Sequence, residues 1–254
     1  MTKDNGKLAV SLGLYAVFSL ALPYLNGSVA GSLAEAFGVG KGAAAAAAMA
    51  LEQIVLAGIC LFLLRGRLRS RVVEREEKDV IGRLNGRRVF MFVILMCYAG
   101  ALFAHNLAGF FGTQDMRDFQ SYPVLFLVYA IVVTPLSEEL LFRGLLYDAF
   151  RSRMAPALAG LISAALFAAA HTDPAQMAVA AVLGLLLAFV YEVFWDLRAV
   201  VLIHAVHNAL AMLYPKALVL TGAGLPMRLF LLVLEAACAV YLAVRIYRIR
   251  RIGV

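Results

Sequence analysis

The sequence predicts an all-α, polytopic membrane protein, a bundle of about eight transmembrane helices. Of its 254 residues, 63% are hydrophobic and only 15% are charged, and the mean hydropathy is +0.87. A soluble domain of this length carries about half apolar and about a quarter charged residues. The apolar residues also form runs long enough to cross a bilayer, with basic residues between them. This composition argues against a water-soluble globule and a disordered chain, and three cysteines are too few for a disulfide framework.

Eight apolar runs meet the length of about 17–25 residues that a transmembrane helix needs. In chain order we expect spans at 8–25, 42–64, 89–111, 123–150, 155–172, 174–195, 199–214 and 225–244. The first run has a basic start, as a signal peptide does, but its length exceeds the usual apolar region of about 7–15 residues. We therefore interpret it as the first span of a single integral-membrane domain over residues 1–254.

The basic residues predict the orientation of these spans. The connection Arg65–Arg88, which we expect to be a cytoplasmic loop, holds nine Lys and Arg residues, and positively charged loops stay in the cytoplasm. Alternate threading then places 19 of the 23 basic residues on the cytoplasmic side, together with both termini. Membrane topology thus explains the net charge of +7, so we expect the lipid bilayer as a partner and no nucleic acid.

Ionisable residues inside a transmembrane helix cost about 2.5–3.5 kcal/mol each at its centre, so each requires an explanation. Scattered polar residues in four of the spans are interpreted as packing residues: Glu52, Gln53, His105, Glu192 and Glu235. The fourth, fifth and seventh spans differ, because each of them carries a group of polar side chains at helical spacing.

The fourth span contains two adjacent carboxylates and an arginine in the segment 134–143. Glu139 and Arg143 are four residues apart, so they share a helix face and can form an ion pair. Glu138 is rotated from Glu139 by about 100° and points elsewhere. One carboxylate is therefore expected to be neutralised locally, while the other faces a cavity.

The fifth and seventh spans bring an aromatic ring, two imidazoles and a carboxamide into the apolar region. Phe167 and His171 lie on one face of the fifth span, and His204 and Asn208 stack at the same four-residue spacing in the seventh. We expect the three spans to converge, so that these groups and Glu138 surround one hydrated pocket.

The three motifs, Glu138-Glu139-x-x-x-Arg143, Phe167-x-x-x-His171 and His204-x-x-x-Asn208, resemble the signature of the CPBP family, within about residues 134–211. This family groups the type II CAAX prenyl endopeptidases with bacteriocin-processing and related Abi-type intramembrane proteases. The resemblance implies that Glu138 and His171 activate a water molecule and that His204 and Asn208 stabilise the oxyanion. Glu139 and Arg143, with Phe167, would support them.

The residues suit peptide hydrolysis, which needs a base for water, an acid for the leaving amine and donors for the tetrahedral oxygen. We favour a metal-free, glutamate-type mechanism without a cofactor, because an amide such as Asn208 is a good oxyanion donor but a poor zinc ligand. A metalloprotease remains an alternative, because Glu138, His171 and His204 could hold a divalent metal such as zinc.

We expect a multi-pass protein of the bacterial plasma membrane, with a membrane-anchored or amphipathic peptide as its substrate. Two other functions are alternatives to this endopeptidase. Buried Glu and His residues also serve proton-coupled transporters, but the polar groups here have no counterpart in the earlier spans. A non-catalytic binding or immunity scaffold is the third alternative, against which the intact motifs argue.

Overall fold

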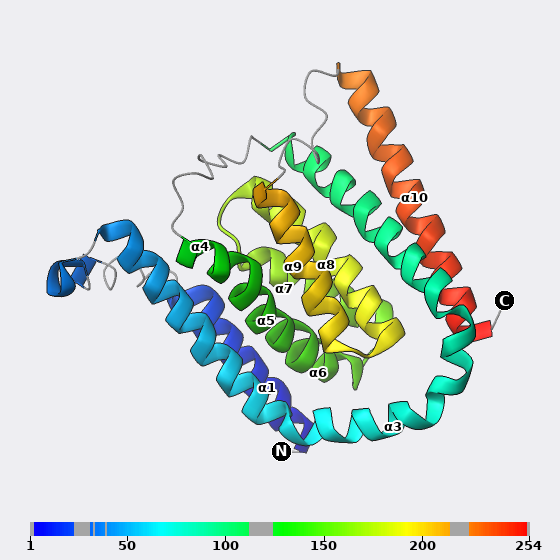
Figure 1. The fold of residues 1–254 in the computed structure, drawn as a ribbon, viewed down its shortest axis with the longest axis horizontal. Coiled ribbons are helices and arrows are strands. Elements are labelled where there is room, and N and C mark those ends of the chain that lie inside the picture. Colours follow the sequence, from blue (N-terminus) through cyan, green and yellow to red (C-terminus); the bar gives the residue numbers. More distant parts are fainter. Residues whose placement is uncertain are drawn as a thin grey trace. The chain divides into compact units, whose positions relative to one another are not determined.

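The computed structural model describes residues 3–22, 31–32, 34–38, 40–111, 124–213 and 224–252, and all regular elements in these ranges are helical (Figure 1). This confirms the predicted all-α class. Segments marked η are π-helical. The elements are α1 (Lys3–Tyr15), η1 (Ala16–Ala21), α3 (Lys41–Ala108), α4 (Val124–Val128), η3 (Tyr129–Val133), α5 (Thr134–Glu139), η4 (Leu140–Tyr147), α6 (Asp148–Arg151), α7 (Pro156–Ala169), α8 (Pro174–Phe194), α9 (Leu197–Leu213) and α10 (Leu225–Ile252).

Four helical stretches of the described chain are long and apolar enough to cross a membrane. They are Ala47–Gly66, Val89–Ala108, Pro174–Phe194 and Leu225–Ile249, which correspond to the second, third, sixth and eighth predicted spans. Their large apolar side chains are widely exposed, for example Val233 at 70% and Phe62 at 60%. Such surfaces suit contact with lipid rather than water. Shorter apolar helices cover the first, fifth and seventh predicted spans, and the count of eight stays a prediction.

The connection 65–88 differs from the expected loop, because its backbone is helical and α3 is continuous from Lys41 to Ala108. The local sequence accounts for this difference. No proline occurs anywhere within α3, and the connection is rich in arginine and glutamate, which favour helix. The basic segment therefore joins two candidate spans as helix.

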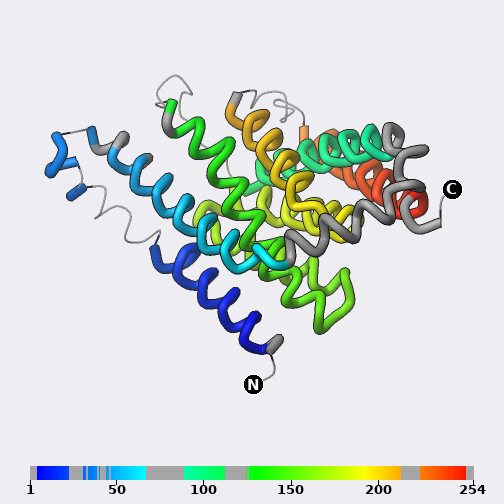
Figure 2. The backbone as a smooth tube through the Cα atoms, turned by 60° about the horizontal axis from the view of Figure 1, so that its bottom comes forward, coloured from blue at the N-terminus to red at the C-terminus, as the bar shows by residue number. Residues whose placement is uncertain are grey.

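The chain divides into two compact units, and the first comprises residues 1–64, 116–163 and 196–213. Its centre is η4, of which all eight residues are buried. Within this unit α9 lies along η3, α5 and η4, while α1 packs on η4 and α6 (Figure 2). Tyr15 of α1 meets Phe142 of η4 edge to face, with ring centroids 5.9 Å apart. The fourth predicted span, which carries the two glutamates and Arg143, is thus the core of this unit.

The second unit comprises residues 65–115, 164–195 and 214–254. Small residues bring the second half of α3 against α8, where Ala104 and Ala108 pack with Ala175 and Val179. Gly184 allows α8 to lie close to α7. A Cβ added at Gly184 would lie 3.0 Å from the Cα of Ala164 in α7.

Polar packing residues also stabilise the second unit, as interpreted from the sequence. The amide Nδ2 of Asn106 in α3 donates to Glu235 Oε1 of α10 at 2.7 Å, and the ring Nδ1 of His105 lies 2.9 Å from the carbonyl oxygen of Ala101. Both histidine and glutamate are buried. The cost of placing them in an apolar helix is offset by these hydrogen bonds.

Candidate active site

The fourth predicted span is a continuous series of helical segments from Val124 to Arg151, in which π-helical turns alternate with α-helical ones. Segments in π register often mark functional sites, because they turn side chains away from their regular positions. The two glutamates end α5, and η3 and η4 flank that helix on either side. The acidic pair therefore sits between two changes of helical register.

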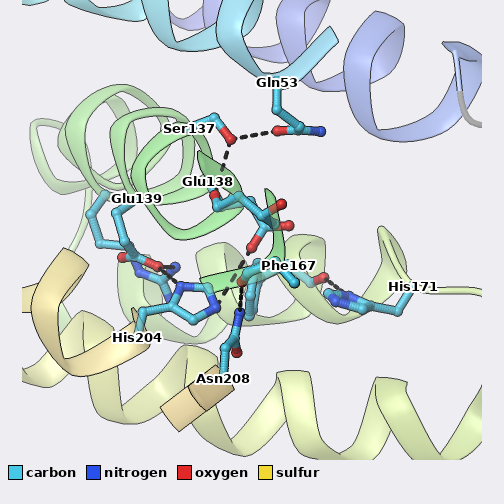
Figure 3. Close-up of polar contacts among 11 residues, drawn as sticks. Gln53, Ser137, Glu138, Glu139, Phe167, His171, His204 and Asn208 are labelled. Carbon is cyan, nitrogen blue, oxygen red and sulfur yellow. Dashed lines mark hydrogen bonds and ion pairs between the residues drawn. The ribbon is translucent and has the colours of Figure 1, made fainter. Parts of the chain in front are cut away.

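Glu139 and Arg143 form the predicted ion pair. Arg143 Nη1 lies 2.8 Å from Glu139 Oε1, and both side chains are completely buried. His204 of α9 is bonded to the same carboxylate, with its Nδ1 2.8 Å from Oε1 (Figure 3). Because an ionised carboxylate can only accept a hydrogen bond, Nδ1 carries the hydrogen in this pair. Glu139 thereby sets the orientation of the imidazole.

The opposite edge of the same imidazole faces Glu138. Glu138 Oε2 lies 3.7 Å from His204 Nε2, and the Glu138 side chain is 19% exposed while that of His204 is 3% exposed. The two carboxylates therefore lie on opposite sides of one ring. Sequence reasoning missed that His204 lies between both glutamates, since this contact joins residues 65 positions apart.

Asn208 lies one turn after His204 on α9 and is half-buried. Its Nδ2 donates to the carbonyl oxygen of Ala130 in η3 at 2.9 Å (Figure 3). His204 and Asn208, predicted to share one helix face, thus contact the fourth span at two places. His204 contacts a side chain and Asn208 contacts the backbone.

Ser137, directly before the two glutamates, connects α5 with the first half of α3. Its buried hydroxyl contacts the side-chain amide of Gln53 and lies 3.0 Å from the carbonyl oxygen of Thr134 (Figure 3). The sequence singled out Gln53 only as a packing residue and did not single out Ser137. Gln53 could be singled out because it is a large polar residue in an apolar span. Ser137 could not, because a small hydroxyl residue is common in such spans.

Phe167 and His171 belong to the second unit, at the end of α7. Their rings meet edge to face with centroids 5.3 Å apart, which confirms that they share one face. His171 Nδ1 lies 2.9 Å from the carbonyl oxygen of Phe167 (Figure 3). The turn that follows is closed by Asp173, which caps α8 by accepting from the Gln176 amide N–H at 2.8 Å.

The structure therefore brings together five of the seven predicted site residues in the first unit: Glu138, Glu139, Arg143, His204 and Asn208. It pairs the other two, Phe167 and His171, within the second unit. That the two groups meet around one water molecule stays a prediction of the sequence motifs.

An all-helical chain with lipid-suited helices and a buried carboxylate–imidazole cluster belongs to the class of integral membrane proteins. Residues 120–210 match the sequence model of a family described as type II CAAX prenyl endopeptidase Rce1-like. This match confirms the resemblance seen in the three motifs, and it covers all seven predicted site residues. It supports a CAAX-type intramembrane protease. Curated proteins and solved structures give no match to the chain.

Proposed function

We propose that this chain is an intramembrane endopeptidase of the bacterial plasma membrane, with eight transmembrane helices and both termini in the cytoplasm. Its substrate is a membrane-anchored or amphipathic peptide, because such a chain can reach a site below the lipid headgroups. One observation carries the proposal. The imidazole of His204 lies between Glu138 and Glu139, inside the region that matches the CAAX endopeptidase family.

Water activation is assigned to Glu138 and His171. The Glu138 carboxylate takes a proton from water, the hydroxide adds to the carbonyl carbon of the scissile bond, and the C–N bond then breaks as the proton passes to the leaving amine. A general base of this kind contributes about 10²–10⁴-fold to the rate. The half-buried Glu138 suits this role better than Glu139, because Glu139 is buried and bonded to both Arg143 and His204. The pairing of Glu138 with His171 rests on the motif resemblance.

Oxyanion stabilisation is assigned to His204 and Asn208. With hydrogens on both ring nitrogens, His204 would carry one positive charge and could donate from Nε2. Together with Arg143 it would then balance the two negative charges of Glu138 and Glu139, so that the cluster has no net charge. Buried charges are tolerated when they are balanced and hydrogen-bonded in this way. Glu139 and Arg143 support the reaction by fixing the orientation of His204.

Metal dependence is a second part of the proposal, and we favour hydrolysis without a metal. Within either unit, the described residues hold no group of three metal-binding side chains. In the alternative mechanism Glu138 and His204, whose Oε2 and Nε2 atoms face each other, would hold a zinc ion together with His171. A zinc ion bound there would supply an activated water. The test is the cleavage rate after treatment with a zinc chelator: an unchanged rate supports the metal-free mechanism, and a loss restored by added zinc contradicts it.

The experiment that tests the endopeptidase uses the purified full chain in proteoliposomes and a peptide that carries a C-terminal lipid anchor. The same peptide without the lipid tests the need for an anchor. Glu138→Gln should lower kcat by about 10²-fold or more without loss of folded protein. Glu192→Gln is the matched control, because Glu192 is a half-buried acid of α8 outside the three motifs.

Cleavage by the Glu138→Gln variant at the parental rate would show that the assignment is wrong. Uptake of a solute driven by a pH gradient, abolished by the same substitution, would favour the transporter instead.

A further inference from the structure

The backbone of η3 leaves one carbonyl oxygen without a helical donor. The Thr134 N–H donates to the Tyr129 carbonyl, five residues earlier, so it does not serve the Ala130 carbonyl as it would in an α-helix. In the π register the next donor for Ala130 would be residue 135. That residue is proline, which has no N–H. The combination of the π register and Pro135 thus frees the Ala130 oxygen.

Asn208 supplies the missing donor from another helix. Its Nδ2 lies 2.9 Å from the Ala130 oxygen, and α9 runs along η3. A carbonyl oxygen can only accept a hydrogen bond, so the NH₂ group of Asn208 has to face the Ala130 oxygen. This contact therefore fixes the positions of the nitrogen and the oxygen of the carboxamide. One amide hydrogen is used in this contact, and the second hydrogen is held in a fixed direction.

From this arrangement, and on the basis of the proposed function, we infer that Pro135 is a positioning residue of the active site. Pro135 leaves the Ala130 carbonyl available, this carbonyl orients the carboxamide of Asn208, and the second amide hydrogen is presented to the oxyanion. The fourth span then holds α9 at two points, since Glu139 binds His204 one helical turn from Asn208.

The inference predicts an energetic coupling between Pro135 and Asn208 that can be measured without any activity. In the parent chain, Asn208→Ala strands the Ala130 oxygen and should lower the Tm of the detergent-purified protein by about 2–12 °C. In a Pro135→Ala background the restored backbone N–H bonds within the helix, so the same Asn208→Ala substitution should lower the Tm by less than half as much. Pro135→Leu also restores the N–H and serves as a second variant.

The control for this cycle is Pro156→Ala, which alters a proline at the start of α7. Its effect on the Tm should add to that of Asn208→Ala without coupling. If Asn208→Ala lowers the Tm by the same amount in the parent chain and in the Pro135→Ala background, the inference is wrong.

Kinetics separate a positioning role from a merely structural one. Asn208→Ala should lower kcat about 10²–10³-fold. Pro135→Ala should lower kcat about tenfold with KM unchanged, because the amide is present but no longer oriented toward the transition state. In the Asn208→Ala background, Pro135→Ala should have no further effect on kcat. An equal loss of kcat in both backgrounds would contradict the inference.

The two measurements distinguish this inference from the proposed function. If the parent chain cleaves no anchored peptide, the endopeptidase assignment fails, while the Tm cycle still decides whether Pro135 and Asn208 are coupled.

Discussion

The buried ion pair between Glu139 and Arg143 makes a quantitative prediction for Arg143→Met. Both side chains are completely buried and joined at 2.8 Å. Methionine fills a similar volume but leaves the Glu139 carboxylate without its buried counter-charge. Removing one partner of a buried pair costs about 3–5 kcal/mol. For a protein of this size, each kcal/mol corresponds to about 2–4 °C in Tm, so Tm should fall by about 6–20 °C.

Thermal unfolding of the purified protein in detergent, followed by circular dichroism, measures this change. Arg198→Met is the matched control, because Arg198 forms an exposed pair with Asp196 at 3.2 Å and its side chain is 84% exposed. Exposed pairs contribute little, so this control should leave Tm within about 2 °C of the parent.

The double variant Glu139→Gln/Arg143→Met tests the reason for the loss. The glutamine removes the stranded charge, and its side-chain oxygen still accepts from His204 Nδ1. The Tm of the double variant should therefore fall by clearly less than the sum of the decreases in the two single variants. The reasoning is refuted if Arg143→Met unfolds within about 2 °C of the parent, or if the two losses simply add.

Substitutions at three further positions, with their controls, test packing by the same unfolding measurement. Glu235→Gln should leave Tm nearly unchanged, because the amide oxygen still accepts from Asn106. Glu235→Leu removes the acceptor of the Asn106 Nδ2 hydrogen bond and should cost about 1–3 kcal/mol, so equal Tm values for the two variants would contradict the hydrogen bond. Gly184→Ala should cost about 1–3 kcal/mol by overpacking, whereas Gly58→Ala, with open space around it, should be neutral or stabilising. Gln53→Leu should lower Tm by a few degrees through the lost contact with the serine hydroxyl, and an unchanged Tm would count against that contact.

The sequence was sufficient for the features that depend on spacing along one helix. The ion pair of Glu139 with Arg143 and the shared face of Phe167 and His171 both follow from four-residue spacing, and the structure contains both. The all-α class followed from the apolar runs.

Features that depend on tertiary contacts or on register were not predictable in this way. The bond between Glu139 and His204 joins distant parts of the chain, and helical spacing within each span contains no information about it. The π register of η3 changes which carbonyl is left open, and an α-helical pattern does not show it. Pro135 was nevertheless an available signal, since a proline inside a helix always removes one donor. Residues 65–88, which we expected as a connecting loop, are helical, because their arginine and glutamate residues favour helix.

In the proposed topology α7 crosses the membrane as the fifth span, and its length has a consequence for the surrounding lipid. At 14 residues this helix extends about 21 Å, which is less than the hydrocarbon thickness of about 30 Å in a typical bilayer. Such hydrophobic mismatch is relieved by local thinning of the membrane. We expect the headgroup layer to dip toward the end of α7, so that bulk solvent comes within reach of His171 without a dedicated channel.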